Sequence, residues 1–203
     1  MVADGRVGRA ALLKEQFIRS YGGEPNFHVL VNNTGGPPAG AALAATPEEF
    51  LAAFSSHLLC NQILTQLIVP GMKKAKFGRI INIISTSVKQ PIAGLGVSNT
   101  VRGAVANWAK TLANELGPFG ITVNNVLPGP TRTQRMEALI QNKASKEGKS
   151  AASIEAQMIE EVPARRFAEP AEIASAVAFL ASPAAGYING INLPVDGGRT
   201  ACL

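Results

Sequence analysis

Four short, nearly unbroken apolar runs, separated by longer segments, are the feature that most constrains how this chain can fold. The runs lie at residues 27–32, 79–84, 121–127 and 191–195. A short apolar run without alternation is typical of a strand covered on both faces, as in a parallel sheet. Because the segments between the runs have helical patterns, the sequence predicts the α/β class, with a parallel sheet of about four strands and flanking helices.

The first helix can be bounded from its end signals. Thr46 is a helix-capping residue, Pro47 suits the first helical position, and Glu49 completes a capping box. We expect this helix to run over residues 46–69, since Pro70 and Gly71 should end it.

Three further helical segments are predicted. After Gly94 and Gly96, apolar residues recur at spacings of three and four, which is typical of an amphipathic helix. The members of this stripe are Val101, Ala104, Val105, Trp108, Ala109, Leu112, Ala113 and Leu116. Pro170 opens another helix. The polar segment 132–161, rich in Lys, Ser and Glu, is interpreted as a lid-like helical excursion.

Length and composition favour one globular domain over residues 1–203, since 46% of the residues are hydrophobic and 16% are charged. A net charge of +5 is too small to indicate nucleic-acid binding. No run of 18 apolar residues exists, so we expect neither a membrane span nor a secretory leader. Only Cys60 and Cys202 occur, which fits a reducing, cytoplasmic location, and the few histidines and cysteines lack the spacing of a metal site.

At this point several motifs resemble the short-chain dehydrogenases/reductases, in particular the branch similar to 3-oxoacyl-carrier-protein reductases. Residues 30–35 (Leu-Val-Asn-Asn-Thr-Gly) look like the family's Asn-Asn-Ala-Gly motif, and residues 78–83 look like its serine-bearing strand. Residues 128–133 (Pro-Gly-Pro-Thr-Arg-Thr) resemble its proline-glycine loop, and residues 193–198 resemble its closing strand. The resemblance implies a Rossmann-like fold and an oxidoreductase that uses NAD or NADP on a small-molecule substrate.

The same resemblance also implies a partial domain. Residues 7–21 look like the helix before the family's fourth strand, so the strand, Gly-rich turn and helix that bind the dinucleotide pyrophosphate in the family have no counterpart here. We therefore expect impaired NAD(P) binding by this chain, or none, and a bare edge on the strand at residues 27–32.

Cofactor-contacting positions carried over from the family are Asn32, Asn33, Gly35, Pro128, Gly129 and Thr133. The two asparagines and Gly35 would follow the adenosine ribose, and Thr133 would contact the nicotinamide. Small and amide-bearing residues are also common in turns for backbone reasons alone, and Thr133 equally suits a helix cap.

The catalytic positions depart from the family pattern. By motif, the family's serine is Ser85, its tyrosine falls on Ser98, its lysine on Arg102, and its helix asparagine on His57. The family's tyrosine moves the proton that accompanies hydride transfer, whereas a serine hydroxyl is far less acidic and an arginine stays charged. We therefore expect standard reductase chemistry to be altered at this site.

Two other functions remain open from the residues. A serine hydrolase acting on an ester or lactone could use Ser98 or Ser85 with His57 as the base, since Gly96-Val97-Ser98-Asn99-Thr100 approaches the nucleophile-elbow pattern. Against this, Ser98 also reads as a helix N-cap and His57 as a buried structural residue. The other alternative is a non-catalytic oligomeric scaffold. In either case the helices beginning near Thr46 and Ser98 resemble those of the family's dimer contact, so we expect a homodimer or homotetramer.

Overall fold

A parallel sheet forms the centre of the protein. The computed structural model describes residues 27–202. Within them, the strands are β1 (Val29–Asn33), β2 (Gly78–Ile83), β3 (Ile121–Pro128) and β4 (Asn192–Val195), paired in the order β1-β2-β3-β4. All three pairings are parallel, so the α/β fold with a four-stranded sheet is confirmed. The helix expected over residues 7–21 lies outside the described residues.

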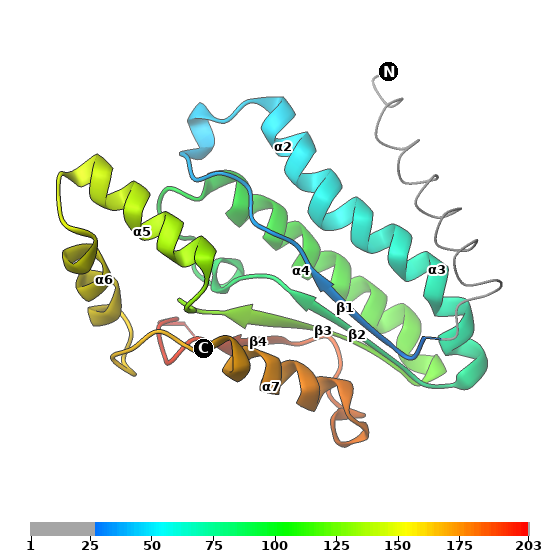
Figure 1. Ribbon diagram of the computed structural model, residues 1–203. Coiled ribbons are helices and arrows are strands. Elements are labelled where there is room, and N and C mark those ends of the chain that lie inside the picture. Colours follow the sequence, from blue (N-terminus) through cyan, green and yellow to red (C-terminus); the bar gives the residue numbers. More distant parts are fainter. Residues whose placement is uncertain (1–26, 203) are drawn as a thin grey trace.

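Helices cover both faces of this sheet (Figure 1). One face carries α2 (Pro47–Phe54), α3 (Cys60–Ala75) and α4 (Gly96–Leu116), and the opposite face carries α7 (Pro170–Ala181). The polar excursion forms α5 (Gln134–Glu147) and α6 (Ala151–Glu160), which extend beyond the carboxyl ends of the strands. None of the helices within residues 27–202 has the length and apolar character needed to cross a bilayer.

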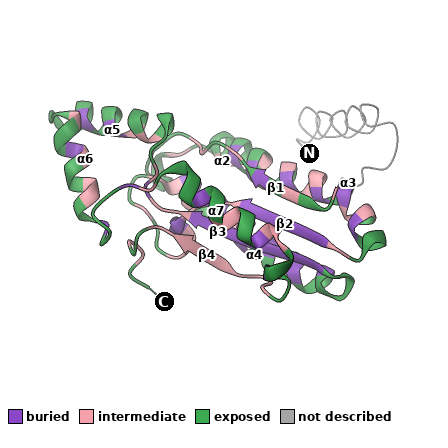
Figure 2. Cartoon of the chain, turned by 60° about the horizontal axis from the view of Figure 1, so that its bottom comes forward, coloured by how far each residue is buried: buried purple, intermediate pink, exposed green. Residues whose placement is uncertain are grey.

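Successive strand residues supply the two layers of the core. Ile80 packs with Met72 and Ala109 of the α3 and α4 layer. The next residue, Ile81, points to the other face and packs with Leu180 of α7. Strand β2 is consequently buried on both faces (Figure 2), as an unbroken apolar run predicts.

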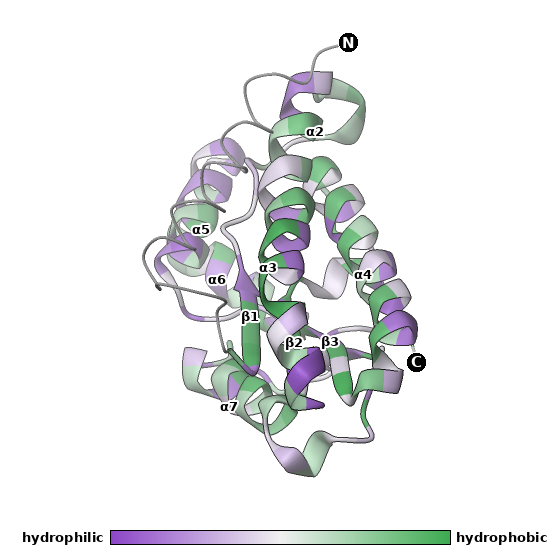
Figure 3. Cartoon of the chain, turned by 90° about the vertical axis from the view of Figure 1, so that its right-hand side faces the viewer, coloured by the Kyte–Doolittle hydropathy of each residue, from purple (hydrophilic) through white to green (hydrophobic). Residues whose placement is uncertain are grey.

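Strand β1 does not meet the same expectation. Val29 and Val31 are 41% and 44% exposed, and His28 before them is exposed as well. Only the face that carries Leu30 and Asn32 is covered, because α7 packs chiefly on β2 and β3. The prediction that the run at 27–32 is buried on both faces is therefore wrong. This apolar strand lies at the edge of the sheet (Figure 3), and among the described residues it pairs with β2 alone.

The capping box at the start of α2 is confirmed. The backbone N–H of Glu49 donates to Thr46 Oγ1 at 3.3 Å, and the backbone N–H of Thr46 donates to Glu49 Oε2 at 2.8 Å. These two bonds satisfy donors that the first helical turn leaves free.

The end predicted for this helix is wrong. After a π-helical turn at Ser55–Leu59, α3 continues past Pro70 to Ala75. Proline removes a donor to the carbonyl of Gln66, but Gln66 and Pro70 are both exposed, so solvent can satisfy that group. Burial of the opposite face of α3 against the sheet keeps the helix intact.

Candidate functional site

Arg102 lies where the carboxyl ends of β1 and β2 meet the first turns of α4. Its side chain is only 8% exposed. Nη1 donates to the carbonyl oxygens of Ile84 at 2.8 Å and Ile83 at 3.2 Å, and Nη2 donates to the carbonyl oxygen of Thr34 at 3.5 Å. The guanidinium thus bridges the ends of two adjacent strands.

Ser98 lies one helical turn before Arg102 on the same face. Its Oγ accepts a hydrogen bond from Arg102 Nε at 3.3 Å, and the residue is buried. The N-cap of α4 is Leu95, so Ser98 lies inside the first turn and the N-cap interpretation is wrong. The helix begins earlier than expected, at Gly96, where the missing side chain permits close contact with Ala42; a Cβ at that position would clash with the Ala42 backbone.

His57 occupies the π-helical turn between α2 and α3 and is 4% exposed. Burial, together with the nearby charges of Arg102 and Arg135, lowers the pKa of His57 from 6.5 to about 4, although a backbone hydrogen bond with Gly35 partly offsets the effect. The imidazole is therefore neutral at neutral pH, and a ring with so low a pKa is a weak general base.

The hydrolase alternative required a hydrogen bond between His57 and a serine. In the described part of the chain no such bond joins His57 to Ser98 or Ser85. Ser98 Oγ receives Arg102 instead, and Ser85 Oγ accepts the backbone N–H of Ser87 at 3.1 Å. The residues fall into one region, as expected, but they do not form a nucleophile and base pair, so the hydrolase interpretation is unsupported.

Some of the loop positions expected to contact a cofactor are exposed to solvent, whereas others are engaged in packing or in a helix cap. Asn33 and Gly35 are exposed, and a Cβ at Gly35 would meet no atom within 4 Å. Pro128 ends β3 and is half-buried. Gly129 has a packing role, because a Cβ there would lie 2.6 Å from the Cα of Asp196. Thr133 Oγ1 accepts the backbone N–H of Met136 at 3.2 Å, which confirms it as the N-cap of α5.

Asn32 is buried within the sheet, unlike its exposed neighbour Asn33. Its side-chain amide donates to Asn82, which donates to Asn125, which donates to Asn192, so one asparagine from each strand joins a ladder across the sheet. The four residues are in register. Asn32 Oδ1 is buried and has no hydrogen-bond partner among the described residues. Asn32 thus orders the sheet near the site rather than presenting its amide to a ligand loop.

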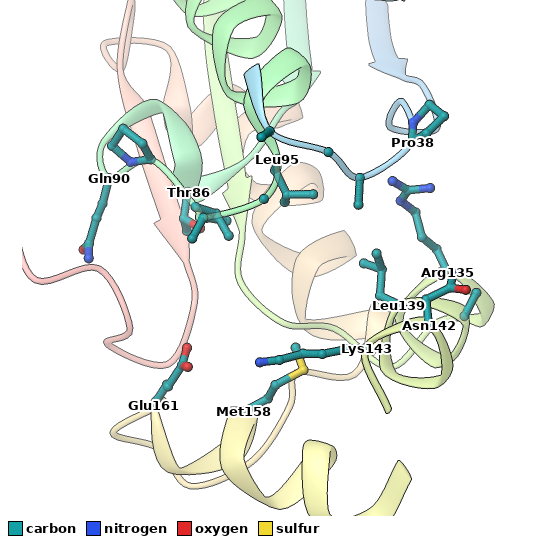
Figure 4. A pocket seen from close by; sticks show the side chains of 18 of the residues that line it. Pro38, Thr86, Gln90, Leu95, Arg135, Leu139, Asn142, Lys143, Met158 and Glu161 are labelled. Atoms are coloured by element: carbon teal, nitrogen blue, oxygen red, sulfur yellow. The ribbon is translucent and has the colours of Figure 1, made fainter. Parts of the chain in front are cut away.

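A pocket of about 1120 Å³ lies between α5, α6 and the loops around residues 38–41 and 90–95. In Figure 4, Arg135 extends from α5 toward Pro38, while Lys143 and Glu161 reach into the cavity. The expected catalytic positions are not among the residues that line this pocket: Ser85, Ser98, Arg102 and His57. Sequence reasoning missed Arg135 and Lys143, although their spacing on one face of α5 is a signal that was available.

Metal ligation has no support in the described residues, since no group of three or more His, Cys, Asp or Glu side chains gathers within residues 27–202.

Several known proteins are similar to this chain in sequence. A family model described as enoyl-(acyl carrier protein) reductase matches residues 11–200. The 3-oxoacyl-[acyl-carrier-protein] reductase of Vibrio cholerae is 36% identical over 170 residues, which cover 84% of this chain and 65% of that relative. The corresponding reductase of Haemophilus influenzae is 35% identical over 188 residues, covering 92% of this chain and 71% of that protein.

A solved reductase structure has the same fold as this chain. An actinorhodin polyketide ketoreductase variant with NADPH superimposes with a TM-score of 0.86 at 30% identity, covering 98% of this chain and 77% of that one. This chain spans about two thirds to three quarters of the length of these proteins. The extent of the family match, the identity to the two reductases and the shared fold together show that the chain belongs to the short-chain dehydrogenase/reductase family.

Proposed function

We propose that this chain is an oxidoreductase of the short-chain dehydrogenase type that acts on a small molecule and has an altered proton-transfer site and weak NAD(P) binding. The observation that carries the proposal is the bond from Arg102 Nε to Ser98 Oγ at 3.3 Å, at the positions that resemble the family's lysine and tyrosine. The relatives are reductases, and the ketoreductase neighbour was solved with NADPH.

The chemistry of this pair supports the altered site. A serine hydroxyl has a pKa far above neutrality, so Ser98 is a poor proton donor compared with a tyrosine phenol. Arg102 can orient a hydroxyl or a charged group but does not shuttle a proton. Its donors already bind Ser98 and the strand-end carbonyls, which fixes its position.

The described loops fit one part of a nicotinamide dinucleotide. Asn33 and Gly35 border open space beyond β1, where they would follow a ribose, and Pro128 and Thr133 flank the exit of β3, where they would face the nicotinamide. A bound nicotinamide would supply or accept the hydride.

A nucleotide titration tests the proposal. Thermal unfolding is followed with NADP and NAD from micromolar to millimolar concentration, with adenosine as the matched control for the base alone. We expect a rise in Tm only at millimolar nucleotide, because the shift grows with the ratio of ligand concentration to Kd. Saturation at micromolar concentration would contradict impaired binding, and a flat Tm up to about 10 mM would contradict nucleotide binding and favour the non-catalytic scaffold.

The proposal also includes an oligomeric state and a cellular location. Leu51 and Phe54 of α2 are 55% and 37% exposed, which supports a homodimer or homotetramer through this helix. Cys60 and Cys202 are both free thiols, which is consistent with the cytoplasm.

A further inference from the structure

Two guanidinium groups converge on Gly36, which follows Gly35 in the loop after β1. A Cβ at Gly36 would lie 3.1 Å from Arg135 Nη2 and 3.5 Å from Arg102 Nη2. The two side chains come from α5 and α4, which are far apart in sequence. Because glycine has no side chain, both guanidiniums can approach the backbone here, and a Cβ would crowd Arg135 Nη2.

Neither arginine has a carboxylate partner among the described residues. Arg102 binds Ser98 and backbone carbonyls, and Arg135 Nη2 donates to the carbonyl oxygen of Pro37 at 2.8 Å. Carbonyl groups satisfy hydrogen-bonding capacity but carry no compensating charge. Two cations held this close without an anion repel each other, more strongly because Arg102 is buried.

Buried Arg79 provides a comparison within the same chain. It also donates to backbone carbonyls, such as that of Gly78 at 2.8 Å, and its guanidinium lies 4.3 Å from the ring centroid of Phe77. Burial alone lowers the pKa of Arg79. Burial and then the charge of Arg135 lower the pKa of Arg102 to about 10, so Arg102 remains charged at neutral pH. Burial accounts for the shift at Arg79, whereas Arg102 combines burial with a second guanidinium close by.

The side chains that line the adjoining pocket carry a net positive charge, like the two arginines at Gly36. Arg135 lines it together with Lys143, Lys146 and Arg199. The single carboxylate of the lining, Glu161, is paired with Arg199 at 2.8 Å. A ligand in this pocket meets an excess of positive charge, with Arg135 joining the pocket wall to the Gly36 cradle.

We propose that Arg102 and Arg135 together bind the oxyanion group, a carboxylate or a phosphate, of a small molecule that extends from this pocket past Arg135 to Gly36. Planar guanidinium groups match such oxyanions because they present parallel N–H donors. The proposal deepens the proposed function by naming the chemical class of ligand, and it rests on that function only in treating the pocket as the substrate site.

Isothermal titration of the whole chain with inorganic phosphate and, separately, malonate tests the cradle. We expect millimolar binding, weakened about tenfold or more in Arg135→Gln. Gly36→Ala keeps both charges, but its Cβ would crowd Arg135 Nη2 at 3.1 Å and shift this guanidinium, so it should weaken binding as well. Arg165→Gln removes an exposed arginine outside the pocket lining and should leave the affinity unchanged.

The outcomes separate this inference from the proposed function. Equal oxyanion affinity in wild type, Arg135→Gln and Gly36→Ala would overturn the cradle, whatever the nucleotide titration gives. Variant-sensitive oxyanion binding without any NADP effect on Tm would support the cradle and count against the cofactor proposal alone. A competition arm identifies the source of the group: displacement of malonate by nicotinamide mononucleotide assigns the cradle to a cofactor phosphate, and independent binding assigns it to the substrate.

Discussion

The side-chain amide of Asn32 donates to Oδ1 of Asn82 at 2.8 Å, and this bond begins a ladder that crosses all four strands. Asn82 is fully buried and donates onward to Asn125 at 2.9 Å. Because Asn82 both accepts from Asn32 and donates to Asn125, its loss leaves two buried neighbours without these partners.

Asn82→Ala should therefore lower the free energy of unfolding by about 2–4 kcal/mol. Urea unfolding followed by circular dichroism measures the change. Asn107→Ala, on the exposed face of α4, is the control and should stay within about 0.5 kcal/mol of wild type. An effect of Asn82→Ala as small as that of the control would show that the ladder does not stabilise the sheet.

His57 should make the protein less stable in mild acid. Its pKa is about 4 in the folded protein and 6.5 where the side chain is fully solvated, as in the unfolded chain, so between these values the unfolded chain binds a proton that the folded chain does not. The free energy of unfolding should fall as the pH drops through this window, by roughly 1–3 kcal/mol for this residue.

His57→Asn should flatten the stability profile between pH 6.5 and about 4, because asparagine does not titrate. Denaturant midpoints measured across this range test the expectation. His28→Asn, which removes the exposed histidine, should retain the wild-type slope. A profile for His57→Asn that parallels wild type would assign the acid sensitivity to other groups.

Two loop glycines should respond differently to the same substitution. A Cβ at Gly129 would lie 2.6 Å from the Cα of Asp196, so Gly129→Ala forces backbone apart and should cost about 2–4 kcal/mol. Gly35→Ala meets no atom within 4 Å and should be neutral or stabilising by about 0.4–1 kcal/mol. Thermal and urea unfolding compare the pair, and similar losses in both variants would contradict the distinction between a packing glycine and an open-loop glycine.

Assembly should depend on the exposed apolar residues of α2. Leu51→Lys places a charge on a surface that is expected to be covered in the dimer or tetramer, so it should shift the protein toward monomer at micromolar concentration. Light scattering coupled to size-exclusion chromatography measures the mass. Leu43→Lys, at a fully exposed position outside α2, should leave the mass unchanged, and a monomeric wild type would refute the expected assembly.

The local sequence was sufficient to predict the strands and the starts of α2 and α7. Apolar runs located all four strands, and the capping box at Thr46 located the start of α2, because both signals depend on neighbouring residues in the chain. The end of α3 was misjudged, since Pro70 is a local signal whereas the packing of Met72 against the sheet is a tertiary one.

The sequence by itself determined the fold class and the family motifs. The resemblance also predicted that Ser98, Arg102 and His57 lie in one region. Only the tertiary structure decided what these groups do there. It directed Arg102 to Ser98 and to strand-end carbonyls, and it placed Arg135 opposite Arg102 across Gly36. Periodicity and capping follow from the neighbouring chain, whereas the charge, hydrogen-bond partner and burial of a side chain depend on segments that only folding brings together.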